Sequence, residues 1–288
     1  MADGPSLWLV VDDVQDELVR HLAAAATTRQ VALLTVDAGT VDLLQLPQLG
    51  AGDLLYRIGS SHRACVAEQL LWSPQVTTFY ADALGPHRLL DTQELVLARA
   101  GVPVPKAAYA LPTTVEQLRT TVDALGGLPI VIKRPGSSLG EGVMRLDTWT
   151  SLVSVVDALR AEGGDAFLLM SYVAPAVHWR VIVVDDVVVA SYRNPMRDGD
   201  FRTEVREDNP ADFEATVPPQ AATAARSATT ALGLRCAGVD VLVHDSGTAV
   251  VLEANFPFYF AHPKRAGGVD VALAMVDALL ARASGPAP

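Results

Sequence analysis

A β-hairpin in the C-terminal third of this 288-residue chain constrains its fold more than any other segment. Two alternating runs, GVDVLVH and AVVLEAN, flank the turn sequence Asp-Ser-Gly-Thr. If Ser246 and Gly247 form a two-residue loop, Asp240 lies directly opposite Glu253, and Asn255 points to the same side. Because facing carboxylates repel each other, we expect a hard cation with oxygen ligands, Mg²⁺ in first place, to bind there.

The alternative is that both acids lie on a wet face of the sheet, beside unrelated basic residues from other elements. Neither run contains a lysine or an arginine. A one-residue slip of the register would move Asp240 and Glu253 to opposite faces. The hairpin alone therefore leaves metal binding open, and other motifs must decide.

Composition narrows the class of partner. The chain has 22 basic and 33 acidic residues, a net charge of -11 and a pI near 4.9, which argues against binding to nucleic acid or to an anionic membrane. Cys65 and Cys236 belong to no ligand cluster, and acids at Asp12 and Asp13 interrupt the first apolar run. We expect a cytoplasmic protein without a signal peptide, acting on small molecules, with a homodimer left open as its oligomeric state.

The periodicity predicts an α/β chain of three modules, with boundaries at residues 1–85, 86–165 and 166–288. The first module opens as a βαβ unit. Its predicted elements are strands at 7–11, 31–36, 53–58 and 77–80 and helices at 14–25 and 62–71. A helix at 87–100 and the connector Val-Pro-Val-Pro at 102–105 follow it.

The remaining modules alternate strands and helices in a looser order. In the second, we expect helices at 113–125 and 148–160 and strands at 129–133 and 142–146. In the third, we expect strands at 166–173, 179–184 and 187–193, a helix at 219–233, the hairpin, and a final helix at 269–283.

A lysine ends the buried strand at 129–133 and is followed by a glycine-rich loop. Glycines tolerate positive φ and let backbone N–H groups approach an anion closely, while Lys133 adds a compact positive charge. The spacing is neither that of a P-loop nor that of a dinucleotide fingerprint. Taken alone, the loop is more typical of an ordinary hairpin with a surface lysine than of a phosphate site.

Taken together, these motifs resemble the ATP-grasp superfamily, and its RimK-like branch fits best. The motifs, in order, are Arg-Ile-Gly at 57–59, Ala-Gly-Val-Pro-Val-Pro at 100–105, Val-Ile-Lys at 131–133, Trp-Arg-Val at 179–181, Gly-Val-Asp at 238–240 and Leu-Glu-Ala-Asn at 252–255. The resemblance implies the ATP-grasp fold, in which an N-terminal βαβ domain precedes two α+β modules that clamp ATP.

The resemblance also implies a function: an ATP-dependent ligase that activates a carboxylate as an acyl phosphate and joins it to an amine. Lys133 would hold a phosphate, and Asp240, Glu253 and Asn255 would carry Mg²⁺. The glycine loop would close over the triphosphate and exclude water. The implied ATP-contacting residues of this loop and of the adenine hinge are Gly136, Ser137, Ser138, Gly140 and Gly142, then Met170, Ser171, Tyr172 and Val173.

Three arginines are candidates for binding carboxylate and for stabilising charge on the transferring phosphoryl group: Arg180, Arg193 and Arg202. His178 departs from the family pattern, because relatives place an Asp there, and Met170-Ser171 stands where they have Gln-Glu. Arg88 lies near the position of a further phosphate-binding lysine. The alternative for Arg202 is a solvated pair with neighbouring acids.

The acceptor side is less defined by sequence. We expect Arg57, Tyr259, His262 and Lys264 to border the substrate, and Phe256 and Phe258 to pack in the core. Three other functions stay open: ring closure within one molecule, as in cycloserine-type antibiotic biosynthesis, modification of a peptide or protein tail, and a regulatory ATP-binding module without chemistry. The sequence leaves the substrates unspecified, with specialised metabolism as the expected setting.

Overall fold

The N-terminal part of the chain forms a parallel sheet. A computed structural model describes residues 4–80, 93–134, 140–163 and 167–284. Strand β1 (Ser6–Val11) lies between β2 (Ala32–Asp37) and β3 (Leu54–Arg57), and helices α1 (Glu17–Thr28) and α2 (His62–Leu71) follow the first and third of them. The βαβ prediction is confirmed here. The expected strand at 77–80 contributes only isolated bridges, from Thr77 to Leu54 and from Tyr80 to Leu234.

A second, antiparallel sheet carries the expected nucleotide-binding strand. Its strand order is β4 (Ala107–Ala108), β7 (Leu168–Ser171), β5 (Ile130–Lys133) and β6 (Val143–Leu146). Helices α4 (Val115–Leu125) and α5 (Trp149–Ala161) pack on one face, against Ile130, Ile132 and Leu169. Because side chains alternate along a strand, Val131 and Lys133 point to the opposite face.

Strand β7 crosses the module division expected from sequence. It follows residue 165, yet its backbone pairs with β5 and β4, so it belongs to the second sheet. The segment at 93–99 is helix α3 (Gln93–Arg99), and it packs against the hairpin strand β11 (Ala249–Asn255). The three-part division of the chain stays a prediction.

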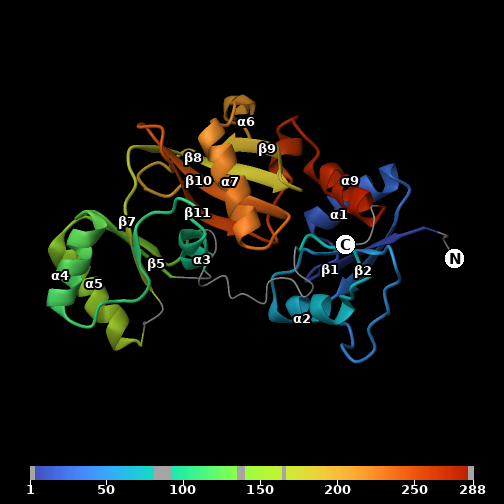
Figure 1. Cartoon of the computed structure of the whole chain (residues 1–288), viewed down its shortest axis with the longest axis horizontal. Coiled ribbons are helices and arrows are strands. Elements are labelled where there is room, and N and C mark those ends of the chain that lie inside the picture. The colour runs from blue at the N-terminus through green and yellow to red at the C-terminus, as the bar shows by residue number, and fades with distance from the viewer. Residues whose placement is uncertain (1–3, 81–92, 135–139, 164–166, 285–288) are drawn as a thin grey trace.

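The third sheet has the order β11, β10 (Cys236–His244), β8 (Ala176–Val184) and β9 (Val187–Arg193), all antiparallel. Helix α7 (Pro219–Ala231) covers its apolar face through buried alanines. Short helices α6 (Pro210–Glu214) and α8 (His262–Arg265) were not predicted, and α9 (Val271–Ala283) packs against α1. Figure 1 shows this sheet between α4 and α5 at one end of the molecule and the N-terminal sheet at the other.

Asp240 does lie opposite Glu253, but the predicted two-residue loop is wrong. His244 N donates to Thr248 O at 2.9 Å, so the loop has three residues, and Gly247 occupies positive φ (86°). This extra residue shifts the pairing by one. An irregularity after Asp240, where Val241 pairs with Val251, shifts it back.

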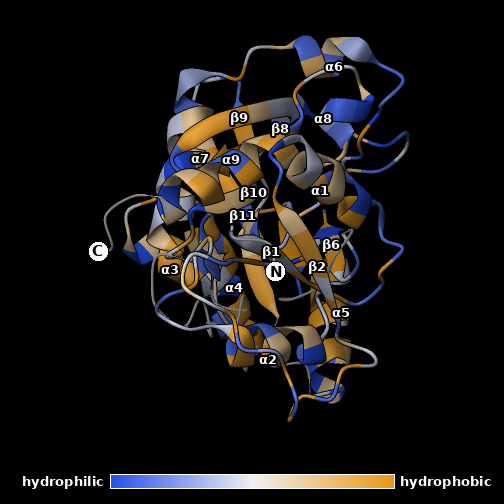
Figure 2. Cartoon of the chain, turned by 90° about the vertical axis from the view of Figure 1, so that its right-hand side faces the viewer, coloured by the Kyte–Doolittle hydropathy of each residue, from blue (hydrophilic) through white to orange (hydrophobic). Residues whose placement is uncertain are grey.

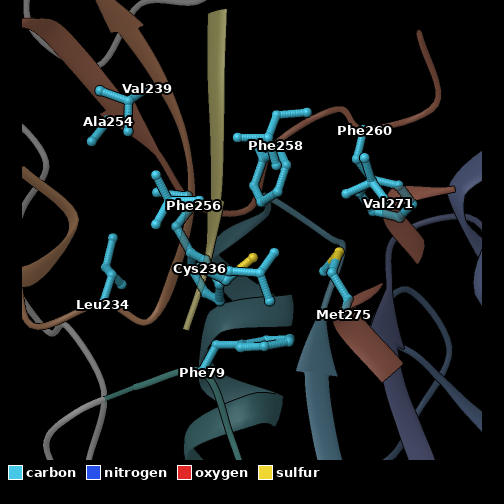
Figure 3. Close-up of a cluster of buried hydrophobic side chains, with 14 of the residues drawn as sticks. Phe79, Leu234, Cys236, Val239, Ala254, Phe256, Phe258, Phe260, Val271 and Met275 are labelled. Carbon is cyan, nitrogen blue, oxygen red and sulfur yellow. The ribbon is translucent and has the colours of Figure 1, made fainter. Parts of the chain in front are cut away.

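One large core joins the N-terminal and third sheets. Phe256, Phe258 and Phe260 are at most 5% exposed, and Figure 3 shows them packed with Phe79 and Met275. The prediction that Phe256 and Phe258 belong to the core is confirmed. Figure 2 shows the hydropathy of each residue, with hydrophobic residues along β9 and hydrophilic residues on α8.

Candidate active site

Lys133 joins the second sheet to the third. Its Nζ lies 3.0 Å from Glu94 Oε1 on α3 and 3.0 Å from Glu253 Oε2 on β11. Burial disfavours the charged ammonium, but the two carboxylates outweigh it and raise the pKa of Lys133 above its usual value. The open face of the second sheet is thereby held against the polar face of the third.

Asp240 is the buried acid at the centre of that polar face. Cross-strand partners share a face, so Asp240 lies beside Arg180 on β8 and Glu253 on β11. Its Oδ1 is 2.9 Å from His178 Nε2 and 3.1 Å from Arg180 Nε. Burial raises the pKa of Asp240, but Arg180 and the His178 hydrogen bond outweigh burial and lower it, so the carboxylate is ionised.

The position of Asn255 bears on whether Asp240 and Glu253 could bind a cation. Within the described part of the chain, no group of three His, Cys, Asp or Glu side chains is arranged around a metal position. The Asn255 Nδ2 atom, however, lies 3.1 Å from Asp240 Oδ2 and 3.0 Å from Glu253 Oε1. Turning the amide over would point its oxygen at the same place, so three oxygen donors converge as Mg²⁺ prefers. The residues fit the ion.

Arg202 reaches the glycine loop from another segment. Its Nη1 donates to Gly140 O at 3.2 Å, and its Nε donates to Asp200 Oδ2 at 2.8 Å. Gly140 and Gly142 both adopt positive φ (75° and 68°), which glycine tolerates without strain. The pair with Asp200 was the alternative foreseen for Arg202, and it coexists with the loop contact. Gly136, Ser137, Ser138 and Arg88 lie outside the described residues.

The expected adenine hinge begins in the last two residues of β7 and continues beyond the strand. Met170 is buried and pairs with Val131, so its side chain shares a face with Lys133, and Ser171 N donates to Lys106 O at 2.9 Å. A surface pocket of about 710 Å³ opens beside Tyr172. The Arg145 guanidinium lies 4.3 Å from the centre of the Tyr172 ring there, and Phe201 meets the ring edge-on. Val173 follows as the last hinge residue.

Two predicted site residues lie elsewhere. Arg193 pairs with Trp179, and Arg180 pairs with Tyr192, so Arg193 points to the opposite face of the sheet from Arg180. It donates to Ala211 O at 2.8 Å and lies 3.2 Å from Asp212. Position near a strand end did not reveal which face it would take.

Arg57 is the second such residue. Its side chain is 8% exposed, and its Nε donates to Glu68 Oε2 at 2.8 Å. Tyr80 OH donates to the same oxygen at 2.7 Å. The Arg57 charge is therefore neutralised inside the N-terminal module, and we assign it a structural role.

The acceptor candidates Tyr259 and His262 lie in a second polar cluster, between α1 and α8. Tyr259 OH donates to Glu17 Oε2, and His262 Nδ1 contacts Glu207. Arg265 bridges both acids: its Nε donates to Glu207 Oε1 and its Nη1 donates to Glu17 Oε2, each at 2.9 Å. Burial lowers the pKa of His262, although the Glu207 carboxylate acts in the opposite direction. Lys264 instead pairs with Asp270 at the start of α9.

The sequence analysis missed two residues that complete the site. Glu94 lies in a helix that had been expected, but its carboxylate is buried at 2% exposure against Lys133. The signal was its place next to Gln93 and three residues before Leu97, on a face that packs inward. His178 had been noted only as a departure from the family pattern, and its two ring contacts needed coordinates.

Comparison with solved structures identifies the fold. The ATP-grasp ligase PsnB, in complex with minimal precursor, Mg and ADP, superposes with a TM-score of 0.73 at 19% identity, covering 99% of each chain. D-cycloserine synthetase DcsG gives 0.71 at 20% identity, covering 96% of this chain and 99% of its own. D-alanine--D-alanine ligase from Bacillus anthracis, complexed with ATP, gives 0.68 at 14%, covering 98% and 97%. The protein has the ATP-grasp fold.

Sequence comparison narrows this class to one branch. The family model for the RimK-like ATP-grasp domain matches residues 92–279, and the chain belongs to that family. A probable alpha-L-glutamate ligase from a Picosynechococcus species is 34% identical over 187 residues, 64% of this chain and 60% of its own. One from Cellvibrio japonicus is 31% identical over 179 residues, 62% and 58%. The chain thus spans about 60% of the length of the curated relatives it matches.

Proposed function

We propose that the protein is an ATP-dependent ligase that joins a small-molecule carboxylate to an amine and releases ADP and phosphate. One observation carries the proposal: Lys133 on one sheet meets Glu253 on another, beside Asp240 and Asn255. Charged groups of both signs thus converge between two open sheet faces. Such an arrangement complements a triphosphate together with its cation.

In this proposal each residue has a role that its contacts support. Lys133 leaves its carboxylate partners to bind a phosphate, and Glu253 is then free to join Asp240 and Asn255 around Mg²⁺. When bound, Mg²⁺ neutralises phosphate charge. Arg180 and Arg202 stabilise charge on the transferring phosphoryl group, and the backbone at 170–173 recognises adenine. Gly140 and Gly142 cover the triphosphate and exclude water.

The chemistry needs no nucleophile from the protein. A substrate carboxylate oxygen attacks the γ-phosphorus, the bond to ADP breaks, and an acyl phosphate forms. The amine nitrogen then attacks the acyl carbon, phosphate leaves, and the nitrogen loses a proton. The protein positions both substrates and neutralises charge, which accounts for a site rich in fixed cations and carboxylates.

The substrates remain the open part of the proposal. We propose that the polar cluster between α1 and α8 borders the acceptor, since it offers charged and hydrogen-bonding groups of both signs. Its members are Tyr259, His262, Glu207 and Arg265. Ring closure within one substrate would use the same machinery. A setting in specialised metabolism stays a prediction. No helix among the described residues has the length and apolar character to cross a bilayer.

The test is ADP and phosphate release from Mg-ATP across a panel of amino acids, small carboxylates and short peptides, with mass spectrometry of each mixture. A product lighter than its substrates by one water, formed only with ADP release, supports the ligase. The same mass change from a single substrate indicates ring closure. Binding of ATP without turnover on any substrate would favour a regulatory module, and absence of ATP binding would overturn the proposal.

A further inference from the structure

His178 makes two contacts that connect separate parts of the candidate site. It lies on β8 with a side chain 11% exposed. Nε2 is 2.9 Å from Asp240 Oδ1, and Nδ1 contacts the Thr203 hydroxyl. An ionised carboxylate only accepts, so Nε2 carries the proton and donates to Asp240. Nδ1 and the Thr203 hydroxyl form the second hydrogen bond of the ring.

Thr203 belongs to a small closed loop. Met196 and Thr203 form a β-bridge, Arg197 N donates to Arg202 O at 2.8 Å, and Glu204 N donates to Pro195 O at 3.0 Å. These bonds fix the backbone around Arg202. Any constraint on Thr203 is therefore transmitted to the neighbouring arginine.

Arg202 completes the path to the glycine loop, since its Nη1 donates to Gly140 O at 3.2 Å. A Cβ on Gly140 would lie 3.0 Å from Arg202 Cδ, so the two segments are in close contact. A continuous series of contacts thus runs from Asp240 through His178 and Thr203 to Arg202 and Gly140.

We infer that His178 and Thr203 form a tether that positions the 194–204 loop, and with it Arg202, against Gly140. His178 is a positioning residue here, acting through Asp240 and Thr203 rather than on the substrate. The inference rests on the proposed function for its kinetic consequence. Its structural consequence is measurable in the free protein.

The structure offers variants that separate the two bonds. Thr203→Val keeps the shape of the side chain and removes the hydroxyl, whereas Thr203→Ser keeps the hydroxyl and is the matched control. His178→Gln carries an amide at the reach of Nε2 and keeps the Asp240 contact. His178→Asn carries one at the reach of Nδ1 and keeps the Thr203 contact.

The experiment has two readouts on full-length protein. The first is hydrogen exchange of residues 194–206 without nucleotide. Loss of one such hydrogen bond is expected to speed exchange there about fivefold in Thr203→Val and in His178→Gln, and to leave Thr203→Ser at the wild-type rate. Equal exchange in Thr203→Val and Thr203→Ser would overturn the tether, whether or not any variant is active.

The second readout is ADP release with the substrate found by the panel. In Thr203→Val we expect kcat to fall about fivefold to tenfold with little change in KM for ATP, because Arg202 is displaced while Lys133 and Asp240 are kept. Retention of wild-type kcat together with faster exchange would overturn the positioning role. If wild type turns over no substrate but exchange responds as expected, the proposed function fails and the tether stands.

Discussion

Two polar networks are both built on ion pairs between basic side chains and carboxylates, and they differ in architecture. The Arg57 network comprises Arg57, Glu68 and Tyr80, all from the N-terminal module, with one cation for one carboxylate. The Lys133 network has three carboxylates for two cations, and its members come from five elements in two sheets and helix α3: Lys133, Arg180, Glu94, Asp240 and Glu253.

The two networks differ in charge balance and in how far apart their members lie in the sequence. The Arg57 network is neutral and local, so nothing is missing from it, and it holds α2 to β3. The Lys133 network has one more carboxylate than cations, even though Arg180 Nε lies 3.1 Å from Asp240 Oδ1. A bound cation would balance the excess negative charge where the two sheets meet.

The largest expected effect breaks the Arg57 network. Arg57→Ala leaves the Glu68 carboxylate buried without its cation, and we expect a loss of about 3–5 kcal/mol in the free energy of unfolding. Urea denaturation followed by tryptophan fluorescence measures it. Replacing both partners, in Arg57→Met with Glu68→Leu, is expected to lose much less. A single variant as stable as wild type would contradict the structural role.

Asp240→Asn tests the other network and should give the reverse pattern. The amide keeps its shape and its acceptor oxygen for His178, so we expect the free energy of unfolding to fall by less than about 1.5 kcal/mol. Turnover should fall by about 10²–10³-fold, because the site loses charge needed for Mg²⁺. Lys133→Ala should lower turnover similarly.

ADP release and urea denaturation of the same preparations make the comparison. Wild-type turnover in Asp240→Asn would remove Asp240 from the site. A stability loss as large as that of Arg57→Ala would make the Lys133 network structural as well, and the distinction between the networks would fail.

The sequence predicted the elements of both networks better than their partners. Alternation placed Asp240, Glu253 and Asn255 on one face, and that arrangement is confirmed, although through a three-residue loop and a compensating irregularity. Periodicity cannot register two offsetting shifts, because each changes the pairing by one residue. The residue placement was right for a partly wrong reason.

Residue type alone did not separate the two arginines that lie at the candidate site from the two that do not. Arg57 and Arg193 resembled Arg180 and Arg202 in sequence, since all four were expected near strand ends or in loops, although Arg180 lies in the middle of β8. What distinguishes them is the acid with which each forms an ion pair. Arg57 pairs with Glu68 and Arg193 with Asp212, whereas Arg180 pairs with Asp240 and Arg202 with Asp200. Such partners lie 11 to 60 positions away, except for Asp200, and tertiary packing alone brings them together.

Gly238→Ala sharpens the comparison at the edge of the Lys133 network. A Cβ there would lie 2.7 Å from Arg180 Nη1 and 2.9 Å from Phe258 Cδ2, so Arg180 must move away from Asp240. We expect a loss of about 1–3 kcal/mol in unfolding free energy, with reduced turnover. Gly50→Ala is the control, because its Cβ would meet Asp53 at an ordinary 3.6 Å. Equal behaviour of the two variants would contradict the close packing.

The smallest effect concerns Asp12, an acid of the N-terminal module outside the Arg57 network. Burial is the largest single influence and raises its pKa, but hydrogen bonds from Ser61 and from the Ser60 N–H together outweigh burial and lower the pKa below 3.8. A carboxyl whose folded pKa is depressed adds stability above its unfolded pKa and loses it as pH falls through the folded value. Because Asp12 is exposed, solvent screening limits the loss to a few tenths of a kcal/mol, about 0.3.

Urea denaturation between pH 5 and about pH 3 measures this loss, with Asp12→Asn as reference. The wild-type protein should lose more stability over that interval than the variant, since the variant cannot titrate at this position. Parallel pH profiles would show that the Ser60 and Ser61 contacts contribute nothing to folding. A difference larger than the loss in Arg57→Ala would contradict this ranking of the sites, because an exposed carboxyl would then contribute more to stability than a buried ion pair.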